Sequence, residues 1–257
     1  MISSILQGGL GNQLFQISAA VSLASDNNDE AIFSIKNHLL PKQGRKCINY
    51  LNNIFQNISF NDHLDIRSYY YEPDFSYQEI IYHPYMCLYG YFQSEKYFFK
   101  NSNKIRDLFS IDGKSYDIIN GKYSFILDKN PISMHVRRGD YLKFKDTHPP
   151  CSVEYYNQAI SSFSESSIFL VISDDIEWCK ENFLGDKFYF VEGNEDYIDL
   201  YLMSLCKNNI IANSSFSWWA AWLNRNKEKI VIAPEKWFGN EVQYNTDNLL
   251  PSSWETI

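Results

Sequence analysis

Residues 133–141 read Ser-Met-His-Val-Arg-Arg-Gly-Asp-Tyr, and the most regular part of the chain is built around them. Apolar side chains at positions 132, 134 and 136 alternate with polar ones at 133, 135 and 137, which predicts a strand with one apolar face. The strand is expected to end at Gly139. Beside this glycine, Arg137 and Arg138 form a fixed positive charge with planar donors, which suits a phosphate. The alternative is that one arginine pairs with a structural carboxylate while the other is solvated.

The second half of the chain alternates between short apolar segments and amphipathic ones. Such a pattern predicts a parallel sheet covered by helices on both faces, whose ligands bind at the carboxyl ends of the strands. Polar groups follow three of these strands, at 137–140, 173–175 and 213–216, so one ligand could contact all three. The predicted strands are 131–137, 168–172, 188–191, 209–212 and 230–233, and the predicted helices are 152–163, 176–183, 195–206 and 215–224.

Each of these polar groups also has a purely structural interpretation. The Ser-Asp-Asp run at 173–175 is a common way to cap a helix, and Ser214 or Ser215 can cap the helix that follows them. Asp199 lies inside the predicted helix 195–206, where a carboxylate is usually solvated. A carboxylate beside a nucleotide pocket nevertheless accepts hydrogen bonds from the adjacent N1–H and 2-amino groups of guanine, a pair that adenine cannot form.

The first half of the chain begins with a glycine-rich segment. Residues 2–6 predict a strand, the Gln-Gly-Gly-Leu-Gly-Asn run at 7–12 a tight loop, and residues 13–24 a helix. A glycine loop between strand and helix can bind an anion, because backbone N–H groups approach the ligand closely and the helix dipole points at it. A tight connection without any ligand is the alternative.

Later segments of the first half give weaker signals. Strands are predicted at 31–35 and 85–91, and a helix at 94–109 that begins at Ser94 as its cap. Residues 37–82 are expected to be irregular and rich in tyrosine. The pattern weakens between 112 and 130, which places a domain junction near residue 125 and predicts domains at 1–125 and 126–257.

Composition limits the possible partners. The 257 residues, 45% of them hydrophobic, are enough for two domains with real cores. The 31 acidic and 23 basic side chains give a formal charge of -8, which argues against nucleic acid or an anionic membrane as a general partner and requires any anion site to be local. Five scattered cysteines without a CxxC pair favour a reducing cytoplasm. No segment approaches the ~20 apolar residues of a membrane span.

Four segments, at 7–16, 90–95, 135–141 and 213–219, together resemble the α-1,2-fucosyltransferase family, glycosyltransferase family 11. The order and spacing match from end to end, and the patterns at 155–156 and 234–237 extend the match. The resemblance implies an α/β, GT-B-like fold of two Rossmann-like domains, with the donor site in the cleft between them. It also implies an inverting transfer from GDP-β-L-fucose to the 2-hydroxyl of a galactose-type residue on a glycan, with no metal or other cofactor.

The same resemblance assigns roles to the domains. Residues 1–125 would form the acceptor-side domain and residues 126–257 the GDP-fucose-binding domain. The chain is somewhat short for the family, and the missing residues are in the first half, where an acceptor would bind. The identity of the acceptor is therefore the property that the resemblance predicts least well. The expected partners are GDP-fucose and a β-galactoside-type glycan. The expected location is the cytoplasm, with peripheral association at a membrane where glycan is assembled left open, and the oligomeric state is not assigned.

The resemblance also implies roles for single residues. Arg137 would hold the β-phosphate and stabilise the charge that develops as the fucose–oxygen bond breaks, and His135 would lie near the nucleotide. Inversion also needs a base for the acceptor hydroxyl, and we take Asp140, just past the arginines, as the candidate, with Asp146 second. Adjacent aspartates at 174–175 are not the DxD pair of metal-dependent enzymes, so no metal ligands are assigned. The expected donor-binding residues are Gly9, Gly11, Asn12, Arg138, Asp174, Asp199, Asn213, Ser214, Ser215, Phe216 and Ser217.

Other functions stay open at this point. Another fucosyl transfer, α-1,6 or to a protein hydroxyl, differs in the linkage of the product. A non-catalytic nucleotide-sugar-binding protein or a tyrosine-rich lectin would show neither donor hydrolysis nor transfer, and a lectin has no use for two arginines beside a glycine turn.

Overall fold

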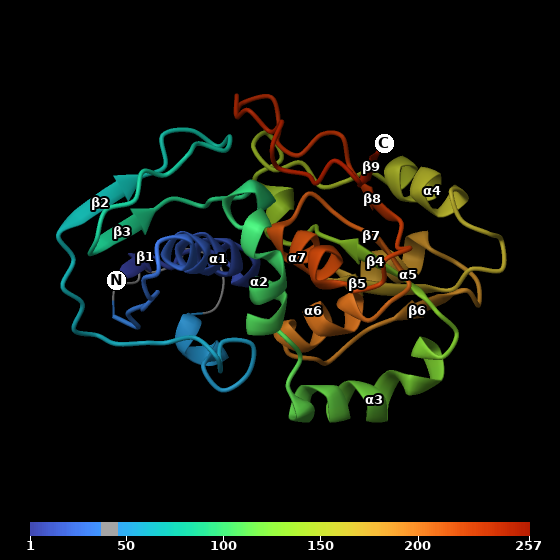
Figure 1. The fold of residues 1–257 in the computed structure, drawn as a ribbon. Helices are drawn as coiled ribbons and strands as arrows, with labels where there is room; N and C mark the ends of the chain where they lie inside the picture. The colour runs from blue at the N-terminus through green and yellow to red at the C-terminus, as the bar shows by residue number, and fades with distance from the viewer. Residues whose placement is uncertain (37–45) are drawn as a thin grey trace. The chain divides into compact units, whose positions relative to one another are not determined.

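The computed structural model describes residues 1–36 and 46–257 (Figure 1). The chain forms two compact units, Met1–Asp112 with Tyr244–Pro251 and Gly113–Gln243 with Ser252–Ile257. The boundary expected near residue 125 falls inside helix α3 (Gly113–Leu127), which belongs to the second unit. This helix is tied to its own unit through Tyr123, whose hydroxyl accepts from Asn194 at 2.8 Å. The chain therefore changes unit before α3, between Asp112 and Gly113.

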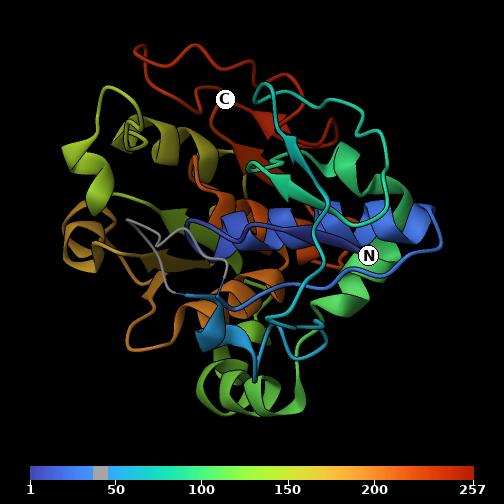
Figure 2. The same cartoon turned by 90° about the vertical axis from the view of Figure 1, so that its left-hand side faces the viewer.

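The first unit contains a three-stranded parallel sheet. Its strands are β1 (Ile2–Ser4), β2 (Ser68–Tyr71) and β3 (Met86–Tyr89), in the order β1-β3-β2. Helix α1 (Leu10–Asp26) lies beside these strands in both views (Figures 1 and 2) and is buried along most of its length. The unit thus has the α/β character that was predicted for it.

The glycine-rich segment is shorter than the sequence suggested. Helix α1 begins at Leu10, so Gly11 and Asn12 are helical and the loop is confined to residues 7–9. Gly8 has a φ of +76° and lies so close to the Asn12 side chain that a Cβ would collide with it. The Gln16 side chain accepts from the Gln7 N–H at 2.9 Å and donates to the carbonyl of residue 90 at 3.2 Å, which ties the end of β1 to the end of β3.

Two other predictions for this unit were wrong. Instead of a strand at 31–35, Ala31 and Phe33 each form a single parallel bridge. Instead of one helix at 94–109, two 3-10 turns, η2 (Glu95–Tyr97) and η3 (Phe99–Asn101), precede a short α2 (Ser102–Leu108). Ser94 does act as the predicted cap, accepting from the Lys96 N–H at 3.3 Å. Between 46 and 82, η1 (Cys47–Tyr50) and β2 break the irregular segment, while 37–45 lie outside the described residues.

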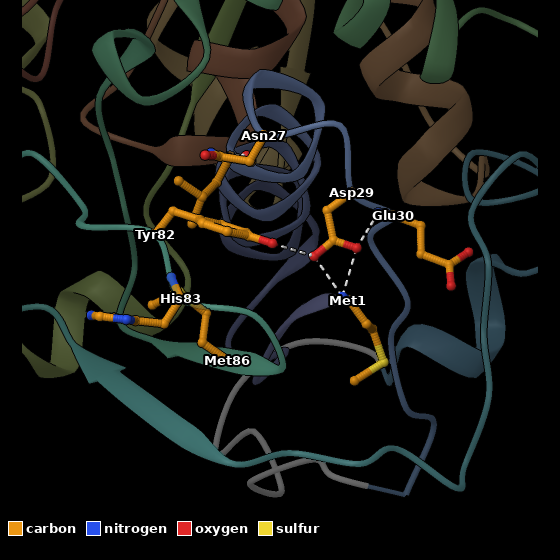
Figure 3. Close-up of polar contacts among 8 residues, drawn as sticks. Met1, Asn27, Asp29, Glu30, Tyr82, His83 and Met86 are labelled. Atoms are coloured by element: carbon orange, nitrogen blue, oxygen red, sulfur yellow. Dashed lines mark hydrogen bonds and ion pairs between the residues drawn. The ribbon is translucent and has the colours of Figure 1, made fainter.

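A partly buried polar contact joins three parts of this unit. The Asp29 carboxylate, just after α1, accepts from the Met1 amino group at 2.5 and 2.6 Å (Figure 3). It also accepts from the Tyr82 hydroxyl at 3.0 Å and from the Glu30 N–H at 2.8 Å. The start of β1, the end of α1 and the segment that leads into β3 are therefore held at one carboxylate.

The second unit contains a six-stranded parallel sheet in the order β6-β5-β4-β7-β8-β9. Its first five strands and four of its helices lie within two residues of their predicted bounds, whereas β9 and α3 were not predicted. The strands are β4 (Ile132–Val136), β5 (Phe169–Ser173), β6 (Phe188–Phe190), β7 (Asn208–Ile210), β8 (Val231–Ala233) and β9 (Glu255–Thr256), and the helices are α4 (Val153–Ser161), α5 (Ile176–Asn182), α6 (Asp196–Ser204) and α7 (Ser215–Leu223).

Both faces of β4 are buried, as predicted for a central parallel strand. On one face, Met134 and Val136 belong to a core cluster that includes Tyr156 of α4 and Cys179 of α5. On the other face, polar side chains meet α6 and α7. The Asn209 amide donates to the Ser133 hydroxyl at 2.7 Å and to a carbonyl of α6, and the His135 ring lies 5.4 Å from the Phe216 ring of α7. No helix in the described part of the chain is long and apolar enough to cross a bilayer.

Candidate functional site

The two arginines follow β4 directly, and three aspartates hold them. Arg137 Nη2 lies 2.6 Å from Asp140 Oδ1, and its Nη1 lies 3.0 Å from Asp174 Oδ2. Asp140 begins η4 (Asp140–Lys143), and Asp174 follows β5, the neighbour of β4 in the sheet. One third of the Arg137 side chain is exposed, so a ligand can reach it. The guanidinium is therefore held in place and remains accessible.

Arg138 is fixed more tightly. Its Nε lies 3.1 Å from Asp175 Oδ2, and its guanidinium carbon lies 3.9 Å from the centroid of the Trp178 ring, a cation–π stack. Its backbone N–H donates to Asp174 Oδ1 at 2.9 Å. Both arginines thus pair with carboxylates. The alternative interpretation expected one paired and one solvated arginine, and the solvated arginine is not found. Pairing with a carboxylate is what the alternative expected of one arginine, so the binding of a phosphate by Arg137 stays a prediction.

Gly139 is required by this arrangement. A Cβ at this position would lie 2.5 Å from Asp174 Oδ2, inside the carboxylate that binds Arg137. Only a residue without a side chain lets the turn after β4 approach the end of β5 so closely. The glycine that ends the strand therefore also allows the arginine–aspartate contacts.

His135 lies under the arginines and is buried, with 4% of its surface exposed. Burial lowers the pKa of His135 to about 4, with the Asp174 charge opposing this shift and the Arg137 charge adding to it. Within residues 1–36 and 46–257, its Nδ1 has no hydrogen-bond partner. The ring is therefore neutral at physiological pH and cannot supply a positive charge to a phosphate.

The segment at the end of β7 is held by its own hydrogen bonds. The Asn213 amide nitrogen donates to the carbonyls of residues 149 and 237, both at 2.9 Å, and the Asn213 carbonyl accepts from the Tyr141 hydroxyl at 3.0 Å. The amide nitrogen of Asn213 is thus committed to positioning the loop. Ser217 Oγ is buried and lies 3.3 Å from the Ser214 carbonyl, so this hydroxyl also bonds within the protein.

The capping interpretations of two helices are wrong in detail. Ser214 occupies the N-cap position of α7, but its side chain makes no capping hydrogen bond. Asp175 occupies the N-cap position of α5, and its carboxylate pairs with Arg138 instead of capping the helix. Ser173 accepts from the Asp175 N–H at 2.9 Å, which fixes the turn. Helix α7 begins at Ser215, and a helix N-terminus is a place where backbone N–H groups can bind an anion.

Asp199 is not the solvated helical carboxylate of the structural alternative. It lies on α6 and is largely buried, and burial raises the pKa of its carboxyl to about 6. Asn194 Nδ2 donates to Asp199 Oδ1 at 2.8 Å, and this bond opposes the rise in pKa. A second oxygen of the same carboxylate is therefore left for other donors. Asn194 was not predicted as a site residue. Its position just before a helix that begins with acidic residues is a sequence signal that could have indicated it.

The predicted residues of the glycine segment belong to the first unit. Gly9 is the N-cap of α1, and a Cβ there would meet no atom. The position that requires a glycine is the neighbouring Gly8, which was not predicted as a site residue. Asn12 Oδ1 accepts from Gln93 Nε2 at 2.9 Å. Asp146, the second candidate base, is exposed in the second unit. Over the described residues, no three His, Cys, Asp or Glu side chains form a group that could hold a metal ion.

A parallel α/β sheet with two arginines fixed at its carboxyl edge and a part-buried carboxylate on α6 has the features of an α/β protein that binds an anionic ligand such as a nucleotide. The comparison with known families makes the assignment specific. The family described as Glycosyl transferase family 11 matches residues 1–257, and the chain therefore belongs to that family.

Two relatives give the range of similarity. The alpha-1,2-colitosyltransferase of Escherichia coli is 39% identical over 184 residues, a match that spans 65% of this chain and 61% of that protein. The O-antigen biosynthesis glycosyltransferase WbnK of Escherichia coli is 29% identical over an alignment of 303 residues that covers 98% of each chain.

A solved structure confirms the GT-B-like α/β fold that was predicted. The fucosyltransferase NodZ from Bradyrhizobium superposes with a TM-score of 0.55 over 85% of this chain and 91% of that chain, at 13% sequence identity. A structure of NodZ alpha-1,6-fucosyltransferase soaked with GDP-fucose gives a TM-score of 0.54. At this identity the likeness concerns the fold alone.

Proposed function

We propose that the chain transfers L-fucose from GDP-β-L-fucose to the 2-hydroxyl of a terminal galactose-type residue on a glycan, with inversion at the fucose anomeric carbon. The observation that carries the proposal is the geometry of Arg137, a partly exposed guanidinium held between Asp140 and Asp174. Family membership and the α-1,2 linkage in the name of the colitosyltransferase relative support the reaction class.

Arg137 suits the leaving group of this reaction. As the bond from fucose to the β-phosphate breaks, negative charge grows on the phosphate, and a preorganised guanidinium stabilises it more in the transition state than in the ground state. A planar fork binds two phosphate oxygens at once, which an ammonium cannot do. Asp140 and Asp174 hold the fork in place before the donor arrives.

Asp199 suits the nucleobase of the donor. One of its oxygens accepts from Asn194, and the other can accept from guanine. Burial raises the pKa of this carboxyl because the ionised form has lost water. Hydrogen bonds from guanine would replace that water and stabilise the ionised form, so guanine binding and ionisation of Asp199 favour each other. We propose that this carboxylate selects GDP over ADP.

We also propose that transfer needs no metal ion. The carboxylates beside the arginines are already paired with guanidinium groups, so a divalent cation would have to displace an arginine to bind there. The positive charge that a cation brings to a diphosphate is supplied instead by Arg137 and Arg138.

The test is a donor and acceptor screen with the purified chain. Labelled GDP-fucose is incubated with a panel of β-galactosides, and the linkage of any product is determined by NMR. Formation of an α-1,2-fucosyl galactoside supports the proposal. An α-1,6 product, a fucosylated protein, or GDP-fucose binding without hydrolysis or transfer would replace it with one of the alternatives.

A second donor is included because of one relative. The colitosyltransferase of Escherichia coli is 39% identical to the segment of this chain that it matches. Colitose is the 3-deoxy form of fucose, so a pocket that recognises the 3-hydroxyl separates the two donors strongly, whereas a pocket that ignores it does not. Faster transfer from GDP-colitose than from GDP-fucose would assign the chain to colitosyl transfer.

A further inference from the structure

His148 lies between η4 and α4 and has no part in the function proposed so far. Its imidazole is half-buried between two aromatic rings. The ring centroid of Tyr141 lies 5.4 Å away, and that of Phe238 lies 5.5 Å away in an edge-on arrangement. Since Tyr141 directly follows Asp140, this packing places the imidazole beside the turn that carries the two arginines.

One chain of hydrogen bonds decides which nitrogen of His148 carries the proton. Thr147 Oγ1 lies 3.2 Å from the Phe144 carbonyl oxygen, and its only hydrogen is donated there. The same Oγ1 lies 3.1 Å from His148 Nδ1 and therefore accepts from it. The neutral ring then carries its hydrogen on Nδ1, and Nε2 keeps a lone pair. In the described part of the chain, Nε2 makes no hydrogen bond.

The backbone around His148 is held in place from two directions. The His148 N–H donates to the Phe144 carbonyl at 2.7 Å, and the Gly239 N–H donates to the Thr147 carbonyl at 3.0 Å. A Cβ at Gly239 would collide with the carbonyl of Asp146, so the two segments touch at their backbones. The orientation of the imidazole is therefore set by the fold and not by a flexible loop.

Other candidate bases at this edge of the sheet are weak. In the free protein Asp140 and Asp174 bind Arg137, and Asp175 binds Arg138, so the oxygens that face the guanidiniums are already occupied. His135 is 4% exposed and its Nδ1 is buried, so the ring is poorly accessible to a substrate hydroxyl. These pairings hold in the free protein, and the role of Asp140, our first candidate base from the sequence, stays a prediction that the experiments below test.

His148 combines access with the right protonation state. Burial lowers the pKa of its imidazole below the usual value, and the negative charge of Asp140 opposes that shift. The ring is therefore neutral at physiological pH and gains basicity when Asp140 is free to act on it. Lys145 and Asp146 are exposed on the same loop, and Glu241 lies across from it with its N–H on the Asp146 carbonyl.

We propose that His148 Nε2 takes the proton of the acceptor hydroxyl and that Asp140 stabilises the imidazolium that results. This proposal rests on the proposed function. The acceptor oxygen forms its bond to the fucose anomeric carbon, while the bond from that carbon to the phosphate oxygen breaks. The electron pair of the broken bond stays on GDP beside Arg137, and the acceptor proton moves to Nε2.

The same contacts couple the base to the donor. In the free protein Arg137 lies 2.6 Å from Asp140 and neutralises its charge. When Arg137 turns to the phosphate, Asp140 is released to stabilise a positive charge on His148. The base is therefore strengthened further when the donor is bound, which favours proton abstraction in the productive complex.

A first experiment needs no acceptor and no turnover. Imidazole-labelled protein is titrated by NMR with and without GDP, and the nitrogen shifts of His148 report its tautomer and pKa. We expect the Nδ1–H tautomer and a rise in the pKa of His148 on GDP binding. Because GDP is itself negative, the Asp140→Asn variant is the comparison, and the rise should be smaller in it. An Nε2–H tautomer, or an equal rise in Asp140→Asn, overturns the proposal.

A second experiment measures transfer to the β-galactoside that the screen identifies. His148→Asn should lower kcat by roughly 10²- to 10⁴-fold, the usual contribution of a general base, while GDP affinity stays within about twofold. The limb of the pH profile in which activity rises with pH should disappear. His63→Asn, a change of an exposed histidine in the first unit, is the matched control and should leave kcat unchanged.

Variants of Thr147 separate the base from a packing role. Thr147→Val removes the acceptor of Nδ1–H and should lower kcat, and Thr147→Ser should restore it because the hydroxyl returns. Unchanged kcat in His148→Asn, or equal losses in Thr147→Val and Thr147→Ser, contradicts the proposal. Absence of transfer by the unaltered chain would overturn the proposed function instead, while the NMR titration still tests the tautomer and the link to Asp140.

Discussion

The two adjacent arginines have different surroundings, although the sequence presents them as equals. Arg138 is stacked on Trp178 and paired with Asp175, so it contributes fixed charge and rigidity. Arg137 is more exposed and bridges Asp140 and Asp174, two carboxylates that a phosphate can replace. Under the proposed function, Arg137 is therefore the residue that we expect to exchange partners during donor binding, with its guanidinium geometry mattering as much as its charge.

Substitution of Arg137 by lysine tests this reasoning. Arg137→Lys keeps the positive charge but loses the planar contact with two oxygens, and we expect kcat to fall on the order of 10²-fold or more. Steady-state transfer kinetics provide the measurement, with circular dichroism to show that the fold is kept. Arg106→Lys on α2 of the first unit is the control. Near-normal turnover in Arg137→Lys would exclude a phosphate contact at this position.

Asp199 gives a prediction that combines stability and binding. Burial raises the pKa of its carboxyl to about 6, so the free protein carries an unfavourable charge above that pH. Asp199→Asn should therefore stabilise the free protein at pH 7.5, by about 1–2 kcal/mol, and this gain should vanish as the pH falls through 6 towards 4. The same variant should bind GDP about 10- to 150-fold more weakly, because one guanine contact is lost.

Calorimetry of GDP and ADP with the Asp199→Asn protein measures the binding part, and urea unfolding at pH 4.5 and 7.5 measures the stability part. Discrimination between GDP and ADP should fall along with GDP affinity. Asp117→Asn, which changes an exposed carboxylate on α3, is the control for both. An Asp199→Asn protein with unchanged GDP affinity would show that this carboxylate does not contact the base.

At the level of elements, the sequence predicted the second sheet closely because each of its strands is short, apolar and followed by an amphipathic helix. It missed β9, two exposed residues that join the sheet through backbone pairing with β8 and carry no apolar pattern. It also missed α3, where Gly113, Gly121 and several polar residues obscured a buried stripe at 115, 119, 123 and 126. In the first unit, the glycine run suggested a longer loop than the helix start at Leu10 allows.

The candidate site was predictable in composition and less so in geometry. The polar groups after β4, β5 and β7 lie on strands that are neighbours in the sheet, as parallel topology requires. Which aspartate pairs with which arginine depends on the close approach of Gly139 to the Asp174 side chain, and no sequence pattern encodes such an approach. His148 was missed for the same reason, since its tautomer depends on Thr147 and its burial on Phe238.

The missed helix α3 allows a direct test by substitution. Gly121 is exposed inside α3, and a Cβ there would meet no atom, so Gly121→Ala should raise the free energy of unfolding by about 0.5–1 kcal/mol. Gly185→Ala is the opposing control, because a φ of +104° makes alanine strained there and should lower stability. All six tryptophans lie in the second unit, so tryptophan fluorescence during urea unfolding reports on it specifically. A destabilised Gly121→Ala protein would contradict the helical assignment.

On the scale of the whole molecule, the proposed function requires an acidic chain to bind an anionic donor. With a formal charge of -8, the overall field repels GDP, so the attraction must come from the local pair of arginines. The aspartates around this pair contribute to the negative total, yet each is paired with a guanidinium. They keep the arginines positioned and do not form a free acidic cluster that would collect divalent cations.

Removal of metal ions tests whether the two arginines supply the positive charge without a divalent cation. Since Arg137 and Arg138 occupy the aspartates that would otherwise bind a cation, we expect the transfer rate to stay within about twofold in excess EDTA. Added Mg²⁺ or Mn²⁺ should not raise it, because a cation would have to break an arginine pair to enter. Initial rates are compared for dialysed protein, EDTA-treated protein and EDTA-treated protein with each metal restored in excess. Loss of activity in EDTA that returns only with a metal would mean that the arginines alone do not carry the diphosphate charge.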